Sequence, residues 1–532
     1  MPQSPKLRHG WIRLVSVLSV VCAALLGLTS VAVGSEASVA AGRAPVVRTA
    51  AGLVQGKTAG TVDEYLGIPY AAPPVGALRW RPPQPAASWR GVRLATKFGP
   101  HCAQPGSFFG VASTSENCLY LNVFAPAGSA GRDLPVMVWV HGGSLLVGES
   151  NDYNPASLVK DGVIVVTINY RLGALGFLAD SALAARSGGP SGDYGLLDQQ
   201  AALRWVKRNV HAFGGNPRNV TLFGESAGGL SVLSQLVSPG ARGLFQRAIV
   251  ESGSYDLTQQ SQAAADAAGA TFAASVGCTS NTAACLRRLP VSEIIDHEDL
   301  GYTPNVDAAV LPESIKTALA SGRFSHVPVV IGTNHDEWRL FVGLDTLLGS
   351  PVTAANYQAM IASTLGVADT EAATIAARYP LSAYASPSVA LGAVGTDAIF
   401  ACPALTAEDS LARYVPTYAY EFNDENAPER YLPPAGFPYG AAHESEVQYL
   451  FDLRNTTQPG VLSSAQQSLA AVMRQDWTQF AKTGMPARPG GWPRFSPAAP
   501  LALSLVPPEP RVEADYAAEH QCGFWTTVAV SS

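Results

Sequence analysis

Ser226 is flanked by two glycines in the stretch GESAG (224–228), which has the G-x-S-x-G pattern. An apolar run with β-branched residues (219–223) precedes it, and a run with helical spacing (228–237) follows it. A sharp turn from strand to helix exposes the serine hydroxyl, and its glycines let the two arms approach each other. The pattern predicts a nucleophilic serine, with a small residue in an ordinary turn as the alternative.

A nucleophilic serine needs a general base and an acid that orients the base. In the strand–serine–helix arrangement, the acid and then the histidine follow the serine along the chain. Of the nine histidines, four precede Ser226, and three more leave little room for an upstream acid. His520 is two residues from Cys522, whereas His443 lies in a loop of small residues after an apolar run. His443 is therefore the predicted base, with a surface-loop histidine as the alternative.

The acid is expected at the end of the apolar run 327–332, because the sequence TNHDEW follows it directly. Asp336 or Glu337 would then stand at the carboxyl end of a strand, and spacing alone does not choose between them. Solvated loop charges are the alternative for both residues.

The glycine turn HGGSLLVG (141–148) follows another apolar run, 135–140. Such a turn offers free backbone N–H groups, which together with the N–H of Ala227 can surround a tetrahedral oxyanion. Losing one such donor typically costs about 3–4 kcal/mol. A plain turn at the end of a strand is the alternative.

These residues need a framework, and the chain alternates short apolar runs with helix-like segments. Continuous apolar runs of this length suit strands that are buried on both faces, so we expect a mainly parallel sheet covered by helices. Predicted strands are 135–140, 162–170, 219–223, 248–253, 327–332 and 416–422, and predicted helices are 196–210 and 228–237. The Ala-rich segments 255–325 and 340–410 are expected to be helical insertions that form a cap or wall.

The first 40 residues have the pattern of an export signal. Basic residues precede an apolar run (14–34), and the small residues Ser38-Val-Ala40 suit cleavage after Ala40. The run is long enough to span a bilayer, so an uncleaved anchor is the alternative. We therefore expect a secreted single domain, 41–532, in which no later uninterrupted apolar run is long enough to span a membrane.

Net charge and cysteine content limit the possible functions and compartments. The formal net charge is −6, and basic residues are not concentrated beyond the N-terminus, which argues against a nucleic-acid partner. Removing the signal leaves six cysteines, an even number that suits disulfides in an oxidising compartment. Proximity along the chain favours Cys102–Cys118 and Cys278–Cys285, which leaves Cys402–Cys522. No spacing indicates a metal site or a cofactor.

The sequence resembles the type-B carboxylesterases, a family that includes bacterial esterases, mammalian liver carboxylesterases and cholinesterases. The likeness covers nearly all of the chain after the signal. It is carried by YLGIPYAAPPVGALRWRPPQP…WRGV (65–92), SENCLYLNV (115–123), WVHGGSLLVG (139–148), INYRLGALGFL (168–178), FGGNPRNVTLFGESAGG (213–229), GTNHDE (332–337) and GAAHESE (440–446).

The resemblance implies an α/β-hydrolase fold and a serine esterase that uses no cofactor. It implies that Ser226 is the nucleophile, that His443 is the base and that Glu337, rather than Asp336, orients the imidazole. The oxyanion donors would be the N–H groups of Gly143, Ser144 and Ala227. The family's disulfide pattern is similar to the pairing given above.

Two positions depart from the family pattern. Ser144 replaces the usual third glycine of the turn, and Asn117 replaces an aspartate before Cys118, which could weaken a structural ion pair. The loop between Cys102 and Cys118 contains Phe108 and Phe109 but no tryptophan, which argues against cholinesterase activity.

Four further residues have open roles. Glu225 either tunes the site or is a buried structural carboxylate, and Ser252 is a possible hydrogen-bond partner behind the triad. Leu145 and Leu146, like the two phenylalanines, would line an apolar pocket or pack in the core.

The expected reaction is hydrolysis of small-molecule carboxylic esters by water through an acyl-enzyme. Two alternatives stay open: hydrolysis of other acyl bonds (amide, carbamate, thioester or lactone), and a catalytically silent binding module. The presence of Ser226, Glu337 and His443 argues against a silent module. The sequence does not indicate the natural ester or the oligomeric state.

Overall fold

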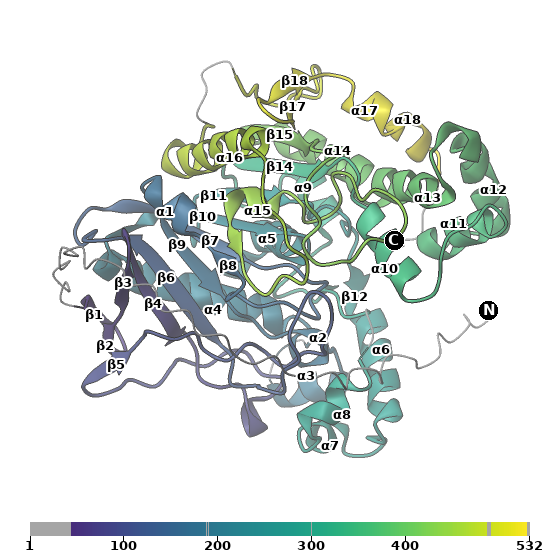
Figure 1. The fold of residues 1–532 in the computed structure, drawn as a ribbon. Coiled ribbons are helices and arrows are strands. Elements are labelled where there is room, and N and C mark those ends of the chain that lie inside the picture. Colours follow the sequence, from purple (N-terminus) through teal and green to yellow (C-terminus); the bar gives the residue numbers. More distant parts are fainter. Residues whose placement is uncertain (1–43, 188, 190, 299–300, 487–490, 529–532) are drawn as a thin grey trace, which may run out of the picture. The chain divides into compact units, whose positions relative to one another are not determined.

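The apolar runs form the parallel centre of one large twisted sheet (Figure 1). The computed structural model describes residues 44–528 apart from 188, 190, 299–300 and 487–490, and the following account concerns these residues. The sheet has eleven strands, of which seven adjacent ones, β17 to β9, are parallel. In spatial order they are β18 (Arg511–Glu513), β17 (Ala502–Leu505), β15 (Thr417–Phe422), β14 (Val329–Asn334), β11 (Arg247–Glu251), β10 (Gly215–Glu225), β7 (Leu134–Val140), β9 (Ile164–Ile168), β6 (Tyr120–Pro126), β4 (Val62–Pro69) and β3 (Lys57–Ala59).

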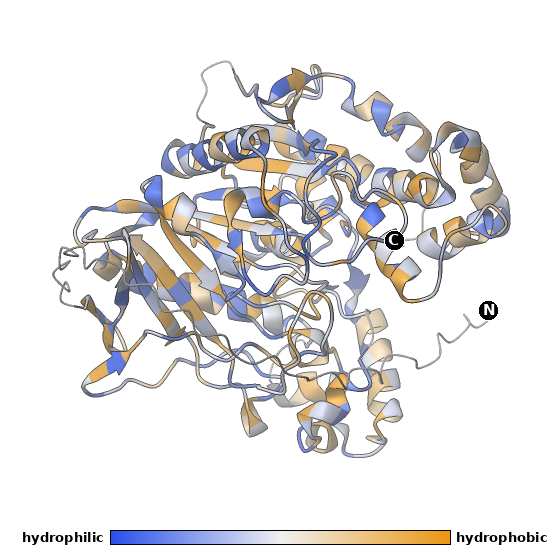
Figure 2. Ribbon diagram, viewed as in Figure 1, coloured by the Kyte–Doolittle hydropathy of each residue, from blue (hydrophilic) through white to orange (hydrophobic). Residues whose placement is uncertain are grey.

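Helices cover both faces of this sheet because its central strands are apolar on both sides. Along β7, Val138 packs in one core cluster with α4 (Tyr194–Asn209) and α5 (Ala227–Val237). Its neighbour Trp139 points to the opposite face and packs with α16 (Ser464–Thr483). This alternation follows from the two-residue period of a strand. The strands accordingly form the hydrophobic centre of the ribbon in Figure 2.

The two Ala-rich segments are helical, as predicted. The first contains α6 (Gln262–Ser275), α7 (Thr282–Leu286), α8 (Val291–Ile295) and α9 (Ile315–Ser321). The second contains α10 (Arg339–Leu347), α11 (Tyr357–Leu365), α12 (Asp369–Arg378), α13 (Pro387–Gly395), the π-helical η5 (Thr396–Ala401) and α14 (Cys402–Ala412).

The described chain also contains shorter elements, including the 3₁₀ helices η1 (Gly76–Leu78), η2 (Val210–Phe213), η3 (Pro239–Ala241) and η4 (Leu381–Ala383). The α-helices are α1 (Ala156–Lys160), α2 (Gly173–Phe177), α3 (Ser181–Ser187), α15 (Val447–Leu450), α17 (Tyr516–Glu519) and α18 (Cys522–Trp525). The strands are β1 (Val46–Thr49), β2 (Gly52–Gln55) and β5 (Val92–Leu94) in one small sheet, and the pairs β12 (Gln260–Ser261) with β13 (Asn305–Val306) and β8 (Tyr153–Asn154) with β16 (Asp452–Leu453).

The six predicted strands and two predicted helices are present, and the fold class is confirmed. The largest difference in bounds is at β10, which begins at Gly215 rather than at residue 219. Gly215 pairs with Leu134 of β7, and an irregularity separates this pair from the regular pairing that resumes at Val220. The interruption explains why the sequence pattern of a strand begins only at residue 219.

The described residues from Ala44 onward group into one compact unit. The predicted export signal and the cleavage point after Ala40 lie outside the described residues. Among the described residues one helix, Pro387–Ala412, is long and apolar enough to cross a membrane, and 67% of its most apolar window is buried inside the protein. Polar residues such as Asp397 interrupt this helix, so it is not an uninterrupted apolar run.

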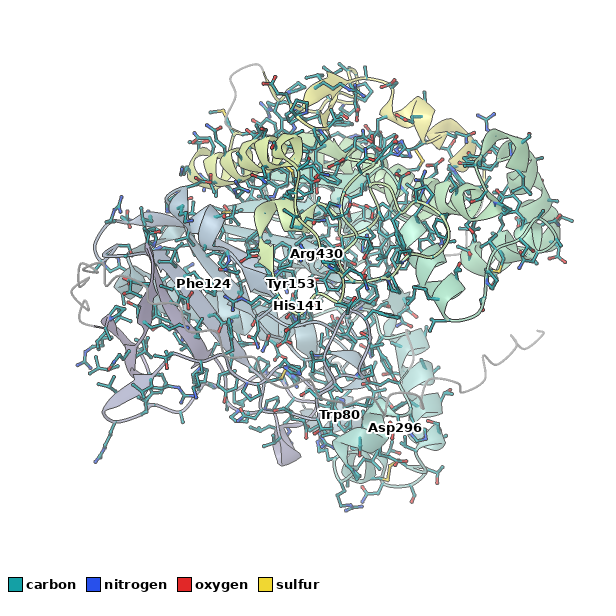
Figure 3. All side chains as sticks on the ribbon, viewed as in Figure 1. Trp80, Phe124, His141, Tyr153, Asp296 and Arg430 are labelled. Atoms are coloured by element: carbon teal, nitrogen blue, oxygen red, sulfur yellow. A yellow bond between two sulfur atoms is a disulfide. The ribbon has the colours of Figure 1, made fainter. Side chains whose placement is uncertain are left out.

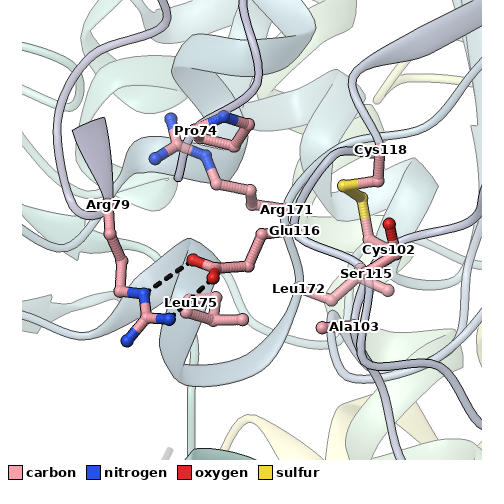
Figure 4. Close-up of a pocket in the computed structure, with 10 residues that line it drawn as sticks. All are labelled: Pro74, Arg79, Cys102, Ala103, Ser115, Glu116, Cys118, Arg171, Leu172 and Leu175. Atoms are coloured by element: carbon pink, nitrogen blue, oxygen red, sulfur yellow. Dashed lines mark hydrogen bonds and ion pairs between the residues drawn. A yellow bond between two sulfur atoms is a disulfide. The ribbon is translucent and has the colours of Figure 1, made fainter. Parts of the chain in front are cut away.

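The three predicted disulfides are present: Cys102–Cys118, Cys278–Cys285 and Cys402–Cys522. Close to the first of them, Glu116 binds Arg79 through two hydrogen bonds of 2.6 Å each (Figure 4). Asn117 instead accepts a hydrogen bond from the Tyr120 hydroxyl. The ion pair beside this disulfide is therefore made by Glu116, and the departure at position 117 leaves it intact.

A second ion pair lies deep in the protein, between Arg171 and Asp198. The carboxylate of Asp198 is fully buried and accepts two hydrogen bonds from the guanidinium, at 2.7 and 2.8 Å. It also accepts one from the backbone N–H of Arg171, at 3.1 Å. These bonds fix the start of the segment that leads from β9 into α2.

We expect Arg171→Met to lower the free energy of unfolding by about 3–5 kcal/mol, because Asp198 would keep a buried charge without its cation. Urea unfolding measures the loss. The matched control is Arg323→Met, which breaks an exposed pair with Glu313 and should change stability little. Equal losses in the two variants would contradict the expectation.

Candidate active site

Ser226 lies at the junction of β10 and α5, in a backbone conformation that L-residues rarely adopt (φ 55°, ψ −122°). The turn is held by the N–H of Ser226, which donates to the carbonyl of Glu251 at 2.9 Å. A Cβ atom at Gly228 would overlap the carbonyl oxygen of Val140, and one at Gly224 would lie 2.6 Å from the same oxygen. Both glycines of the pattern are thus required by the close approach of the turn to the end of β7.

The glycine turn after β7 and the start of α5 together present three backbone donors beside this serine. Gly143 and Ser144 have φ values of 97° and 56°, and the turn closes through N–H groups of Leu146 and Val147 that donate to the carbonyl of Gly143. Within the described residues, the N–H groups of Gly143, Ser144 and Ala227 donate to no protein acceptor. Ala227 is also the first residue of α5, where the helix dipole favours negative charge.

His141, which chain order excludes as the base, anchors this turn. Its ring stacks on Tyr170 with centroids 4.5 Å apart, and its Nδ1 lies 2.9 Å from the carbonyl oxygen of Gly142. Burial lowers the pKa of His141 to about 4, so the ring is neutral near pH 7. The histidine is labelled in Figure 3, near Tyr153. In the sequence, His141 directly precedes the two glycines of the turn, and this position is the feature from which the anchoring role could have been predicted.

The structure brings Glu337 and His443 together. Glu337 follows β14 and His443 lies in the loop after β15, and Oε2 of Glu337 is 2.5 Å from Nδ1 of the imidazole. The other carboxylate oxygen of Glu337 accepts from the backbone N–H of Asn334, at 2.8 Å. Both side chains are buried, at 0% and 6% exposed. The pair can orient an imidazole so that its Nε2 is free to take a proton.

Nε2 of His443 faces Glu225, whose Oε1 is 3.2 Å away. Among the hydrogen bonds of the described residues, none joins this nitrogen to the hydroxyl of Ser226. Such bonds are often long without substrate and tighten only when it is bound. The sequence predicted Glu225 as a neighbour of the site, but not that it would lie against the base.

Glu225 belongs to a group of buried carboxyl groups behind the imidazole. Burial, reinforced by the charge of Glu446 and then of Glu444, raises the pKa of Glu225 well above its ordinary value. Burial and the same neighbour, Glu446, raise the pKa of Glu251 to about 8, and Trp477 donates to this carboxyl group at 2.8 Å. Several of these groups therefore hold protons near neutral pH.

Ser252, at the end of β11, is fully buried with φ 49°. Its N–H donates to the carbonyl of Gly332 at 2.9 Å, and in the described part of the chain its hydroxyl has no hydrogen-bond partner. A role behind the triad stays a prediction.

Asp336 and His520, which the sequence offered as alternatives for the acid and the base, have other partners. Among the hydrogen bonds and ion pairs of the described residues, none joins Asp336 to His443; the carboxylate of Asp336 binds Arg339 at 2.8 Å and accepts from the N–H of Ala441 at 3.0 Å. His520 is buried between two carboxylates of neighbouring elements, 2.6 Å from Asp397 and 2.5 Å from Glu421.

Aromatic side chains border the imidazole of His443. The rings of Phe341 and Phe400 lie 5.3 and 5.0 Å from it, and Trp338 stacks on Phe341 at 4.5 Å. No sequence pattern pointed to these residues. Phe400 lies in the π-helical segment η5, and such segments are frequent at functional sites.

The four predicted pocket residues divide between core and site. Leu145 is buried in the main core cluster, whereas Leu146 is half-buried. Phe108 and Phe109 are half-buried against the small apolar cluster that contains Ala442, the neighbour of the base. Core packing thus accounts for Leu145, whereas the two phenylalanines pack against the cluster that contains the neighbour of His443.

Comparison with known proteins is consistent with this geometry. Residues 43–525 match the sequence profile of the Carboxylesterase family. The chain belongs to this family. It is a carboxylic ester hydrolase with the α/β-hydrolase fold.

Individual relatives cover most of the chain. It is 36% identical over 476 residues to the para-nitrobenzyl esterase of Bacillus subtilis (85% of this chain and 92% of the relative). It is 34% identical over 523 residues to the fumonisin B1 esterase of Sphingopyxis macrogoltabida (92% of each). A solved structure named PNB esterase superposes with a TM-score of 0.77 at 33% identity, over 90% of this chain and 99% of that one.

We expect Ser144→Gly to raise the free energy of unfolding by up to about 1 kcal/mol, because glycine removes the strain of a left-handed residue with a side chain. The side chain of Ser144 is exposed, so its loss costs little packing. Ser144→Ala keeps the strain and should match the wild type in urea unfolding. Equal gains in the two variants would show that the hydroxyl, not the backbone, is responsible.

We expect Glu251→Gln to stabilise the protein at pH 9 but not at pH 5. The folded pKa of about 8 exceeds the ordinary 4.5, so the folded state binds more protons and loses stability as pH rises between these values. The amide oxygen of glutamine can still accept from Trp477. Thermal unfolding at both pH values measures the difference, with the exposed Glu293→Gln as control. A gain of equal size at both pH values would contradict this assignment.

Proposed function

We propose that the chain is an exported serine carboxylesterase in which Ser226 is the nucleophile, His443 the general base and Glu337 the acid that orients it. The observation that carries the proposal is the 2.5 Å contact between Glu337 and Nδ1 of His443, at the same sheet edge as the strained Ser226 turn. The free N–H groups of Gly143, Ser144 and Ala227 support it as the oxyanion donors.

The proposed reaction proceeds in two symmetrical halves. Nε2 of His443 takes the proton of Ser226 as its Oγ attacks the ester carbonyl, and the three N–H groups bind the resulting oxyanion. The imidazolium then protonates the leaving alcohol, which leaves an acyl-enzyme. Water, deprotonated by the same imidazole, attacks the acyl-enzyme and releases the acid and the free serine.

Glu337 and Glu225 lie on opposite sides of the imidazole in this scheme. Glu337 accepts from Nδ1, fixes the tautomer that leaves Nε2 free and stabilises the imidazolium. Glu225 lies 3.2 Å from Nε2, and because its pKa is raised by burial it can be neutral while the base is neutral. A protonated Glu225 does not hold the imidazole as a permanent cation, which keeps the base available.

The proposed substrates are small esters with an apolar part. Phe341 and Phe400 border the base, and Trp338 extends this aromatic wall. Apolar walls of this kind bind the hydrocarbon parts of a ligand, whereas a few polar groups fix its orientation. The loop closed by Cys102–Cys118 has no tryptophan for a quaternary ammonium group, so choline esters are disfavoured.

Export is proposed from the N-terminal pattern together with the three disulfides. Disulfides form and persist in oxidising compartments and are rare in the cytosol. The six cysteines beyond the signal all take part in disulfides, which suits a protein that matures outside the cytosol.

We expect Ser226→Ala to lower kcat for p-nitrophenyl acetate by at least about 10⁴-fold, and His443→Ala to do the same, because the triad acts as a unit. Glu337→Gln should lower kcat by about 10²–10⁴-fold, because glutamine no longer selects the productive tautomer. Steady-state kinetics on a series of p-nitrophenyl esters of rising chain length measures the loss and the acyl preference.

A fluorophosphonate probe is the second measurement. It should label Ser226 in the wild type and leave Ser226→Ala unlabelled. Full activity of Ser226→Ala would exclude the proposed nucleophile, and a wild type that neither reacts with the probe nor cleaves any ester would favour a silent binding module. Cleavage of amides or thioesters with higher kcat/KM than esters would favour the other acyl bonds.

A further inference from the structure

The carboxylate of Asp336, one residue before Glu337, is hydrogen-bonded to the loop that carries His443. It is 4% exposed, and its Oδ2 accepts a hydrogen bond from the N–H of Ala441 at 3.0 Å. The backbone completes the contact, since the N–H of Asp336 donates to the carbonyl of Ala441, also at 3.0 Å. Ala441 is two residues before His443, so these bonds tie the base loop to the end of β14.

The fit at this contact leaves no room for a side chain. Gly440 has φ 70°, and a Cβ atom there would overlap the carboxylate of Asp336 and crowd Arg339. The loop therefore approaches the carboxylate as closely as its backbone allows. A second tie lies further along, where the N–H of His443 donates to the carbonyl of Glu337 at 3.3 Å.

Two cationic groups bind the other carboxylate oxygen of Asp336, Oδ1. Arg339, one helical turn later, lies 2.8 Å from Oδ1, and Nδ1 of His335 lies 3.1 Å from the same oxygen. The second ring nitrogen of His335 reaches Glu519 of α17, at 3.1 Å. Burial lowers the pKa of His335, but the hydrogen bonds to Asp336 and Glu519 outweigh it and raise the pKa to about 11. The imidazole is thus a cation shared between two carboxylates.

We propose that Asp336 is a positioning residue for the ester hydrolysis: it fixes the loop of Ala441 and thereby the distance of the His443 imidazole from Ser226. The carboxylate acts through the backbone and touches neither the imidazole nor the reacting atoms. His335 and Arg339 orient the carboxylate, and Glu519 links this arrangement to the C-terminal helices. The inference rests on the proposed function, because it requires that His443 is the base.

The test compares kcat per active site in Asp336→Ala, Asp336→Asn and the wild type, with p-nitrophenyl acetate as substrate. Complete labelling with a fluorophosphonate counts the active sites, so that loss of folded protein does not enter kcat. Because a misplacement of ~1 Å can cost about 100-fold in rate, we expect Asp336→Ala to lose at least about tenfold in kcat while its KM changes less than about twofold. Asp336→Asn should lose clearly less kcat than Asp336→Ala, because its amide oxygen can still accept from Ala441, although its amide nitrogen cannot accept from Arg339 or His335.

The matched control is Asp180→Ala. Asp180 is also buried and also accepts backbone N–H groups, from Ala182 and Leu183 at 2.8 and 3.2 Å, but it lies at the start of α3. We expect this variant to lose thermal stability while kcat per labelled site stays at the wild-type value. Wild-type kcat per labelled site in Asp336→Ala, or an equal loss in Asp336→Asn and Asp336→Ala, would overturn the proposal.

A double-mutant cycle tests the route through the loop. Gly440→Ala should lower kcat in the wild type by displacing the loop from Asp336, and it should lower kcat less in the Asp336→Ala background, where the carboxylate is absent. If the fold-loss in kcat of the double variant equals the product of the fold-losses of the two single variants, Gly440 and Asp336 are not coupled, and the proposed route through the loop is contradicted. His443→Ala separates the two proposals: an active His443→Ala variant overturns the proposed base, whereas an inactive one together with a fully active Asp336→Ala overturns only the positioning role.

Discussion

The close approach of the β10–α5 turn to the end of β7 is the constraint on which the site depends. The carbonyl of Val140 occupies the space that a Cβ atom at Gly224 or Gly228 would need. This approach leaves Ser226 in a strained conformation, and it places the N–H of Ala227 beside the glycine turn that follows β7. Nucleophile and anion donors are thus brought together by backbone contact between two adjacent parallel strands.

The base and its acid reach the same sheet edge by a different route. Glu337 follows β14 and His443 follows β15, and these two strands are neighbours in the sheet. Carboxyl ends of parallel strands meet at one edge, so residues that are 106 positions apart along the chain become hydrogen-bonded partners. The order of strands, rather than any local motif, makes this contact.

Much of this framework could be predicted from the sequence because it depends on local patterns. Continuous apolar runs identified the central strands. The glycines around Ser226 and in the HGGS turn indicated tight turns in which a Cβ atom would not fit. The resemblance to carboxylesterases chose Glu337 over Asp336, and the contact of Glu337 with His443 is consistent with that choice.

The remaining features depend on contacts that no local pattern encodes. Phe400 reaches His443 from a π-helical segment inside a long insertion, and an Ala-rich stretch gives no sign of such a contact. Likewise Glu225 was expected near the site, but no sequence pattern indicated that its carboxyl group would face Nε2 of His443. Side-chain directions of this kind are decided by tertiary packing, not by spacing along the chain.

The long disulfide Cys402–Cys522 has a consequence for the compartment in which the protein is stable. It closes a covalent ring with a sequence separation of 120, and that ring contains the loop of His443, whereas Ser226 and Glu337 lie outside it. Closing a ring of about 100 residues reduces the entropy of the unfolded chain by an amount worth about 4.7 kcal/mol. Typical domains are stable by only about 5–15 kcal/mol, so opening the ring would remove much of that margin. Reducing conditions would therefore lower the stability of the whole domain by opening the ring that contains the loop of His443.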